Sequence, residues 1–180
     1  VLPDSRGMPA GSTSNWTNGF LPARHQGVPF RTSGDGNAIS NLFPAEKIDP
    51  EVESNSRNLL NKMNHLHMRD TGVNDTLAAR IASYELAARM QLAVPEVTSI
   101  EGETERTREN YGLNGKETRD FGRSCLLARR LLERGVRHVQ LFSGGSFGSP
   151  RINWDGHEDM KRNHRREALR IDQPVAALIK

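Results

Sequence analysis

The sequence predicts an α/β domain in which a mostly parallel sheet is flanked by helices. Apolar residues recur at helical spacing from Phe121 to Leu132, and Gly135 follows where a helix C-cap glycine belongs. The segment 136–142 comes directly afterwards and is β-branched and apolar enough for a strand. A second helical stripe begins at His164, beyond a glycine-rich loop. A helix, a strand and a helix with short connections form the repeating step of a parallel sheet.

The two stripes define the faces that we expect to be buried. The first contains Phe121, Cys125, Ala128 and Leu132, and the second contains His164, Ala168, Ile171, Val175 and Leu178. Because the second stripe stays in phase past Pro174, one helix is expected to continue through that proline with a kink. Cys125 is the only cysteine, which excludes an internal disulfide and a cysteine-based zinc cluster and favours a buried structural thiol.

The remaining segments complete the predicted organisation. Region 1–48 is rich in Gly, Pro, Ser and Asn with interspersed aromatic residues, which indicates loops and short strands. Asp49 can cap a helix over about 50–69, Pro50 suits its first position, and Gly72 ends it. The apolar face of this helix carries Leu59, Met63 and Leu66. A second stripe of the same kind predicts a helical hairpin around 50–93.

We therefore divide the chain into three parts of one incomplete domain, 1–180. The loop and short-strand region 1–48 is followed by a helical insertion, 49–115, whose charged stretch from residue 101 onward predicts an exposed connection. Region 116–180 supplies a helix, a strand, a loop and a helix. The chain lacks an initiating Met and ends on a helical pattern without a stop signal, so we interpret it as an internal fragment.

Composition sets limits on function. The chain is 35% apolar and 26% charged, and no apolar run approaches the roughly 18 residues of a membrane span. The net charge of +3 comes from arginines that are spread over several segments, which is weak evidence for nucleic-acid binding.

The candidate site lies in the loop 143–158, which follows the predicted strand. Ligands of α/β sheets bind beyond the carboxyl ends of the strands. Asp155 and His157 are one residue apart there, so a carboxylate oxygen and an imidazole nitrogen can reach one cation such as zinc, manganese or iron. Two ligands are too few for a complete site. On spacing alone, a helix-capping Asp and a surface His remain the more common roles of such residues.

Neighbouring residues have expected supporting roles. Trp154 would exclude water, and Gly144 and Gly145 would let the backbone approach a bound anion. Arg151 could contact an anionic substrate, although a solvated loop arginine is the more common case. His164 lies on the predicted core stripe, where a packed histidine is more common than a ligand.

Several ordered segments carry a resemblance to a known family. They are 14–16, 19–22, 26–30, 126–136 and Trp154-Asp155-Gly156-His157, with 163–164 and 172–174 continuing the match. On these segments the chain resembles the bacterial sulfatase-like proteins of domain of unknown function 1501, which are similar to the alkaline-phosphatase superfamily. The resemblance covers nearly the whole chain and implies part of an alkaline-phosphatase-like sheet.

The resemblance also implies an activity. It suggests an exported, periplasmic metal-dependent hydrolase of small-molecule or polysaccharide sulfate or phosphate esters. Asp155 and His157 look like the first Asp/His metal pair, with zinc as the expected ion and His164 as a group that orients the ligands. The Gly-Gly-x-Ser-His and Gly-Arg-Asp-His segments of relatives are absent here. The nucleophile and other ligands would therefore lie outside this chain, and the fragment alone would be inactive.

Two alternatives from other classes remain open at this point. A catalytically silent relative would keep the fold as a binding or structural protein. A nucleic-acid module would use the basic ridge of the last helix, formed by Lys161, Arg162, Arg165, Arg166 and Arg170. The interleaved Glu158, Asp159, Glu167 and Asp172 argue against this second alternative, and no nucleic-acid partner is expected. The sequence leaves the oligomeric state open.

Overall fold

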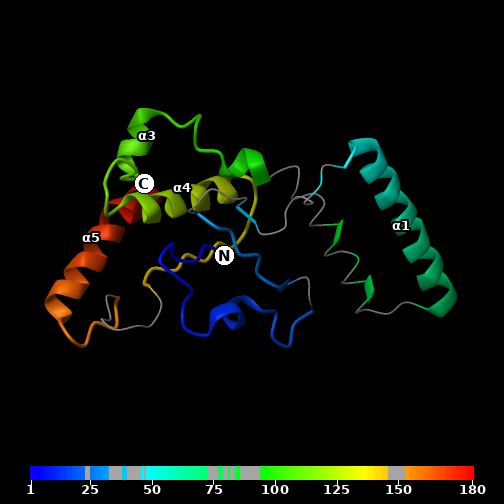
Figure 1. Ribbon diagram of the computed structural model, residues 1–180, viewed down its shortest axis with the longest axis horizontal. Coiled ribbons are helices and arrows are strands. Elements are labelled where there is room, and N and C mark those ends of the chain that lie inside the picture. The colour runs from blue at the N-terminus through cyan, green and yellow to red at the C-terminus, as the bar shows by residue number, and fades with distance from the viewer. Residues whose placement is uncertain are drawn as a thin grey trace.

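The computed structural model describes residues 1–22, 25–32, 38–39, 46, 48–72, 77–78, 81, 84–85, 94–145 and 153–180. Its elements in chain order are the 3-10 helix η1 (Ser12–Trp16) and the helices α1 (Pro50–Thr71), α3 (Glu105–Asn110), α4 (Arg119–Glu133) and α5 (Met160–Ile179). Helices α3, α4 and α5 lie together, the N-terminal segment runs beside α4, and α1 stands at the opposite end (Figure 1). Residues 94–98 are also helical.

The prediction of a parallel sheet is wrong. In the described ranges the chain forms no strand, and the only β pairing is an isolated parallel bridge between Leu2 and Leu141. The Leu2 amide donates to the Gln140 carbonyl over 2.8 Å, and the Phe142 amide donates to the Leu2 carbonyl over 3.0 Å. A β-branched segment becomes a sheet strand only when neighbours supply a continuous row of backbone partners. Segment 136–142 has such a partner at a single residue, so its β propensity is not expressed as a sheet.

Helix α4 ends as the sequence predicts. Gly135 has a φ of 86°, a left-handed conformation that a side chain would strain. Its amide donates to the Leu132 carbonyl over 2.9 Å, and the Val136 amide donates to the Leu131 carbonyl over 3.1 Å. This pair of bonds is a Schellman motif, which satisfies the last carbonyls of the helix.

Both sides of α4 are buried, which makes it the centre of the core. One cluster joins Leu127 and Leu131 to Leu2 and Phe30 of the N-terminal segment. The other side carries Phe121, Cys125 and Leu126, which pack with Tyr111 and Leu113 and with partly buried apolar residues of α5. The predicted stripe holds for Phe121, Cys125 and Ala128, but Leu132 is 48% exposed and Leu131 is buried in its place.

Helix α5 buries a different face from the one predicted. It runs without interruption through Pro174, as expected, but its buried residues are Asn163, Glu167, Arg170 and Pro174. Of the predicted apolar stripe, Ala168 is exposed, and the other members, His164, Ile171, Val175 and Leu178, are only partly buried. Glu167 and Arg170 occupy the interior face because they find charged partners there, which a hydrophobic pattern cannot reveal.

The insertion agrees with the sequence only in part. Helix α1 begins after Asp49, whose carboxylate accepts from the Glu51 amide over 2.8 Å, and it ends at Gly72, as predicted. No residue of α1 is buried, so its apolar face is exposed in the described structure. Most of the second half of the predicted hairpin lies outside the described residues. The residues of this half that the structure describes, 77–78, 81 and 84–85, are helical. The predicted exposed connection instead contains α3, followed by the buried Tyr111.

Candidate functional site

The loop that carries the candidate metal ligands is packed directly on the first turns of α5. The Asn153 side chain is buried and accepts from the Asp155 amide over 2.9 Å. Gly156 is also buried, and a Cβ atom at this position would lie 2.7 Å from Cβ of Asn163. Any larger residue would push the loop away from the helix. A glycine between Asp155 and His157 is therefore needed to seat both side chains at this point.

Asp155 and His157 lie against each other in this loop. The imidazole Nε2 of His157 contacts Oδ1 of Asp155. The Asp155 side chain is 37% exposed and that of His157 is 74% exposed, so both groups face solvent. One oxygen and one nitrogen of ligand type thus lie in direct contact with each other beside accessible space, and a divalent cation that bound both would have to replace this contact. Within the part of the chain that the structure describes, no group of three or more His, Cys, Asp or Glu side chains forms a fuller metal site.

Trp154 and His164 fix the shape of this loop. Nε1 of Trp154 donates to the Ser143 hydroxyl over 3.2 Å, which ties the two ends of the loop 143–158 together. Nε2 of His164 donates to the Trp154 carbonyl over 2.8 Å, and the two rings lie 6.0 Å apart. His164 therefore acts on the backbone that precedes Asp155, which is a positioning contact.

Of the two glycines predicted to matter in this loop, Gly144 alone has a backbone conformation that favours glycine. Gly144 has a φ of 129°, and its amide donates to Oδ2 of Asp4 over 2.8 Å. This amide is therefore bound to a carboxylate of the protein itself. A Cβ atom at Gly145 would make only ordinary contact with Arg6, at 3.7 Å. Arg151, the predicted substrate contact, lies outside the described residues.

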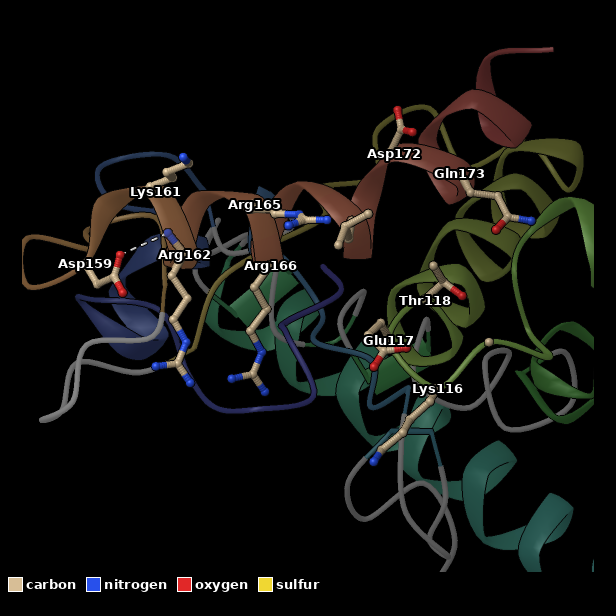
Figure 2. Close-up of a pocket in the computed structure, with 12 residues that line it drawn as sticks. Lys116, Glu117, Thr118, Asp159, Lys161, Arg162, Arg165, Arg166, Asp172 and Gln173 are labelled. Atoms are coloured by element: carbon tan, nitrogen blue, oxygen red, sulfur yellow. Dashed lines mark hydrogen bonds between the residues drawn. The ribbon is translucent and has the colours of Figure 1, made fainter.

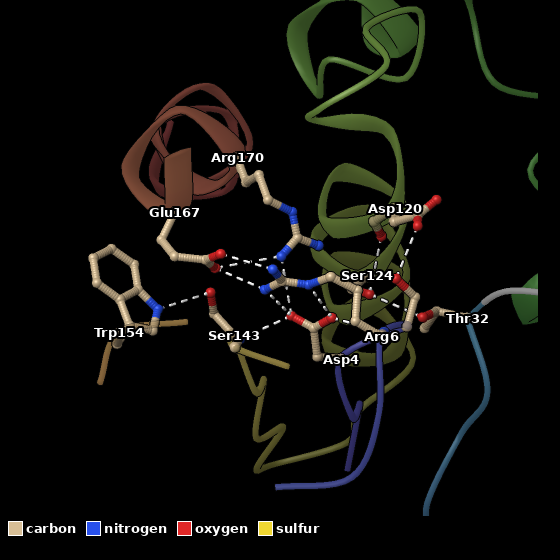
Figure 3. A network of polar contacts seen from close by, with 11 residues as sticks. Asp4, Arg6, Thr32, Asp120, Ser124, Ser143, Trp154, Glu167 and Arg170 are labelled. Carbon is tan, nitrogen blue, oxygen red and sulfur yellow. Dashed lines mark hydrogen bonds and ion pairs between the residues drawn. The ribbon is translucent and has the colours of Figure 1, made fainter. Parts of the chain in front are cut away.

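A buried ionic network, formed by Asp4, Arg6, Glu167 and Arg170, lies directly behind the loop (Figure 3). Arg6 donates from Nη1 and Nη2 to the two carboxylate oxygens of Glu167, over 2.7 Å each. It also donates from Nε to Oδ1 of Asp4 over 3.1 Å. Nη1 of Arg170 lies 3.4 Å from Oδ2 of Asp4 and 3.4 Å from Oε2 of Glu167. Two carboxylates and two guanidinium groups thus compensate one another.

Nothing in the sequence pattern predicts this network. Glu167 is completely buried and Arg170 nearly so, although the sequence pattern places Arg170 on the basic ridge and Glu167 among the acids interleaved with it. Arg170 is therefore not available for a phosphate-facing surface. Asp4 and Arg6 lie more than 150 residues from their α5 partners, and no local spacing predicts such a pairing. The one available signal was a charged pair three residues apart on an otherwise half-apolar helix.

The network shifts the ionisation of its members. Burial alone would raise the pKa of Asp4, but hydrogen bonds from Arg6 and Gly144 and the charge of Arg170 outweigh it and lower the pKa to about 2. Burial would lower the pKa of Arg6, but its bonds to Glu167 and Asp4 hold that pKa above its usual range. Asp4 and Arg6 therefore both remain charged at neutral pH.

We expect the contribution of Asp4 to folding to disappear in acid. Its pKa is lower in the folded chain, at about 2, than the ordinary value of 3.8, so the stabilisation is complete above about pH 4 and is lost as the pH falls towards 2. The difference in unfolding free energy between the wild type and Asp4→Asn should shrink by roughly 2 kcal/mol between pH 6 and pH 2. Urea titrations followed by tryptophan fluorescence measure this difference. A value that stays constant over the pH range would contradict the assignment.

The fold and the site together define a helical protein that presents a carboxylate–imidazole pair on a loop held by a buried ionic network. The family model described as "Protein of unknown function (DUF1501)" matches residues 1–180, and the chain belongs to this family. Membership of domain of unknown function 1501, which the ordered motifs of the sequence predict, is thereby confirmed, whereas the relation to sulfatases and alkaline phosphatases stays a prediction. No curated protein and no solved structure matches the chain. Among the described helices, none combines the length and apolar character that crossing a membrane requires.

Proposed function

We propose that this chain supplies two ligands, Asp155 and His157, to the divalent-metal centre of a hydrolase that acts on sulfate or phosphate esters. The observation that carries the proposal is the direct contact of the Asp155 carboxylate with the His157 imidazole on a solvent-facing loop, because a divalent cation that replaced this contact would gain one oxygen and one nitrogen ligand. The resemblance of the chain to sulfatase-like proteins supports the reaction class. The same resemblance supports export of the protein from the cytoplasm, and zinc as the first ion to test.

The chemistry follows from the donor set. When bound, a divalent cation supplies a Lewis acid that polarises an ester oxygen and lowers the pKa of a coordinated hydroxyl group or water. The carboxylate of Asp155 contributes negative charge that holds the cation, and His157 contributes a neutral nitrogen donor. His164 keeps the loop backbone in place through the Trp154 carbonyl. The Trp154 ring is itself 39% exposed, and its role in excluding water stays a prediction. The remaining ligands and the nucleophile would come from other segments of the full-length protein.

We expect the full-length protein to bind zinc through this loop. Loss of a supporting group around a metal typically weakens binding by about tenfold to a hundredfold, so loss of a direct ligand should cost at least as much. Asp155→Ala and His157→Ala should therefore each weaken zinc binding by at least about tenfold in calorimetric titrations. His138→Ala, which removes another exposed histidine, is the matched control and should bind zinc as the wild type does.

The same variants test the reaction class. Hydrolysis of p-nitrophenyl sulfate and p-nitrophenyl phosphate by the zinc-loaded protein should fall with Asp155→Ala and remain with His138→Ala. If the protein binds zinc but hydrolyses neither ester, the chain belongs to a binding protein and the hydrolase proposal is wrong. If Asp155→Ala leaves both zinc affinity and hydrolysis unchanged, the metal site lies elsewhere.

A further inference from the structure

A second candidate surface lies on the side of α5 that faces away from the ionic network. It is a groove of about 1060 Å³ between α5 and the turn that precedes α4, and we call it the basic groove (Figure 2). Its cationic lining consists of Lys116, Lys161, Arg162, Arg165 and Arg166. All five side chains are exposed. Arg162 and Arg166 are one helical turn apart, about 6 Å along the axis, and extend in the same direction, while Lys116 lies across the groove (Figure 2).

The five cations of the basic groove have no carboxylate partner, whereas most of the other arginines in the helical core have one. Arg129 and Arg130 both pair with Glu103, and Arg134 pairs with Glu96. Arg6 and Arg170 are neutralised within the ionic network. Across the described residues, no ion pair involves a cation of the basic groove. Like charges brought together without partners repel one another, and such an arrangement concentrates a positive field where an anion can relieve it.

The other lining groups indicate what kind of anion fits. Three carboxylates also line the groove: Glu117 follows Lys116, and Asp159 and Asp172 stand at the two ends of the run of cations on α5, with Gln173 beside Asp172. A continuous phosphate backbone would meet these carboxylates unfavourably, whereas sugar hydroxyl groups can donate hydrogen bonds to them. None of the residues that line the groove is aromatic, so it offers no stacking platform for the bases of a single-stranded nucleic acid. Mixed acids and bases favour a hydroxylated scaffold that carries separate anionic groups.

The basic groove also begins beside the candidate metal loop. Asp159 lines the groove and comes two residues after His157 in the chain. Its carboxylate caps α5 by accepting from the Arg162 amide over 3.1 Å. A chain molecule that lies along α5 could therefore reach Asp155 and His157 with one end.

We propose that the basic groove binds an oligosaccharide that carries several sulfate or phosphate groups, and that it delivers one ester group to the Asp155 and His157 loop. The delivery step rests on the proposed hydrolase function, whereas binding in the groove does not require the metal. The cations contact the anionic groups, and the interspersed carboxylates accept from sugar hydroxyls. The groove thus provides a substrate class for the site: a multiply charged sugar ester.

Binding of labelled oligosaccharides to the full-length protein in the presence of a chelator tests the groove separately from catalysis. The probes are dextran sulfate, dextran phosphate and unsubstituted dextran of the same length, together with an oligothymidylate of equal charge, all measured by fluorescence anisotropy. We expect binding of one or both charged dextrans, and no binding of the neutral dextran. The stronger of the two charged dextrans identifies sulfate or phosphate as the group that is recognised. Oligothymidylate that binds as tightly as the charged dextrans would overturn the proposal in favour of a nucleic-acid surface.

Paired variants assign the binding to this groove. Arg162→Gln with Arg166→Gln should weaken binding by about tenfold, since each exposed charge contact contributes modestly. The salt dependence should also become shallower, because fewer counterions are released. Arg162→Lys with Arg166→Lys keeps the charges and should restore most of the affinity. The matched control is Arg106→Gln with Arg123→Gln, which removes two exposed helical arginines outside the groove and should bind normally.

Each outcome has a distinct meaning. If both double glutamine variants weaken binding equally, the effect is one of net charge and the groove is not a site. If the groove variant no longer binds the charged dextrans in the presence of chelator, but its zinc-loaded form still hydrolyses p-nitrophenyl esters, the groove is confirmed as a binding site independently of the small-substrate reaction. If charged dextrans bind at the groove but the protein hydrolyses no ester, the proposed hydrolase function fails while the binding site stands.

Discussion

Glu167→Ala should lower the free energy of unfolding by about 3–5 kcal/mol, the range expected when one partner of a buried ionic pair is removed. The Glu167 carboxylate is completely buried and accepts two hydrogen bonds of 2.7 Å from Arg6. It also lies 3.4 Å from Arg170. Its loss would leave two guanidinium groups that share the single carboxylate of Asp4. The penalty arises mainly from this uncompensated positive charge in a desolvated space.

Chemical denaturation of Glu167→Ala and two companion variants measures the effect. Glu167→Gln retains the size and one acceptor oxygen, so it should be less stable than the wild type but more stable than Glu167→Ala. The control Glu101→Ala removes an exposed carboxylate and should change stability by less than about 0.5 kcal/mol. A loss below about 1 kcal/mol for Glu167→Ala would show that Arg6 and Arg170 find other partners, and the ionic network as described would be wrong.

The ionic network also links stability to the candidate site. Asp4 accepts from the Gly144 amide, and the adjacent Ser143 hydroxyl accepts from Trp154. Disruption of the network would therefore loosen the loop that carries Asp155 and His157 without any change in those residues. For this reason a loss of zinc binding in Glu167→Ala should scale with the loss of stability, whereas Asp155→Ala should lose zinc binding at unchanged stability.

The sequence predicted features that depend on a few neighbouring residues. Asp49 caps α1 and Gly135 ends α4 as expected, because each satisfies backbone groups within its own helical turn. The close approach of Asp155 and His157 is also local, since a spacing of one residue around a tightly packed glycine brings the two side chains together, whereas their role as metal ligands stays a prediction. The family was recognised for a related reason, because ordered motifs are preserved in the sequence itself.

Features that depend on distant partners were not predicted. The segment 136–142 has strand propensity, but a sheet needs neighbours that the described structure supplies only at Leu2. The buried face of α5 is polar because Arg6, from the start of the chain, reaches Glu167. Hydrophobic periodicity assigns charged residues to the surface and has no means of detecting this compensation. The basic groove was visible only as a ridge, since Lys116 comes from a different segment.

Gly122→Ala should lower the free energy of unfolding by about 3 kcal/mol, although the same change in an exposed helix would be stabilising by roughly 0.5–1 kcal/mol. Gly122 lies in α4, and a Cβ atom there would stand only 2.0 Å from the Tyr111 carbonyl oxygen. That oxygen is part of the backbone and cannot move as a flexible side chain could. The turn that contains Tyr111 is held on both sides by backbone hydrogen bonds. The Tyr111 amide donates to the Thr107 carbonyl over 3.0 Å, and the Leu113 amide donates to the Arg108 carbonyl over 2.9 Å.

Whether Gly122→Ala lowers or raises the free energy of unfolding distinguishes the effect of close packing from that of helix propensity. If α4 and the Tyr111 turn pack as described, the added methyl group must push them apart and disturb the cluster around Cys125 and Leu126. Urea unfolding of Gly122→Ala, compared with Gly102→Ala, measures this. A Cβ atom at Gly102 meets no atom within 4 Å, so the control should be neutral or slightly more stable. A Gly122→Ala protein at least as stable as the wild type would show that α4 does not contact the Tyr111 backbone, and the arrangement of the core around α4 would then be wrong.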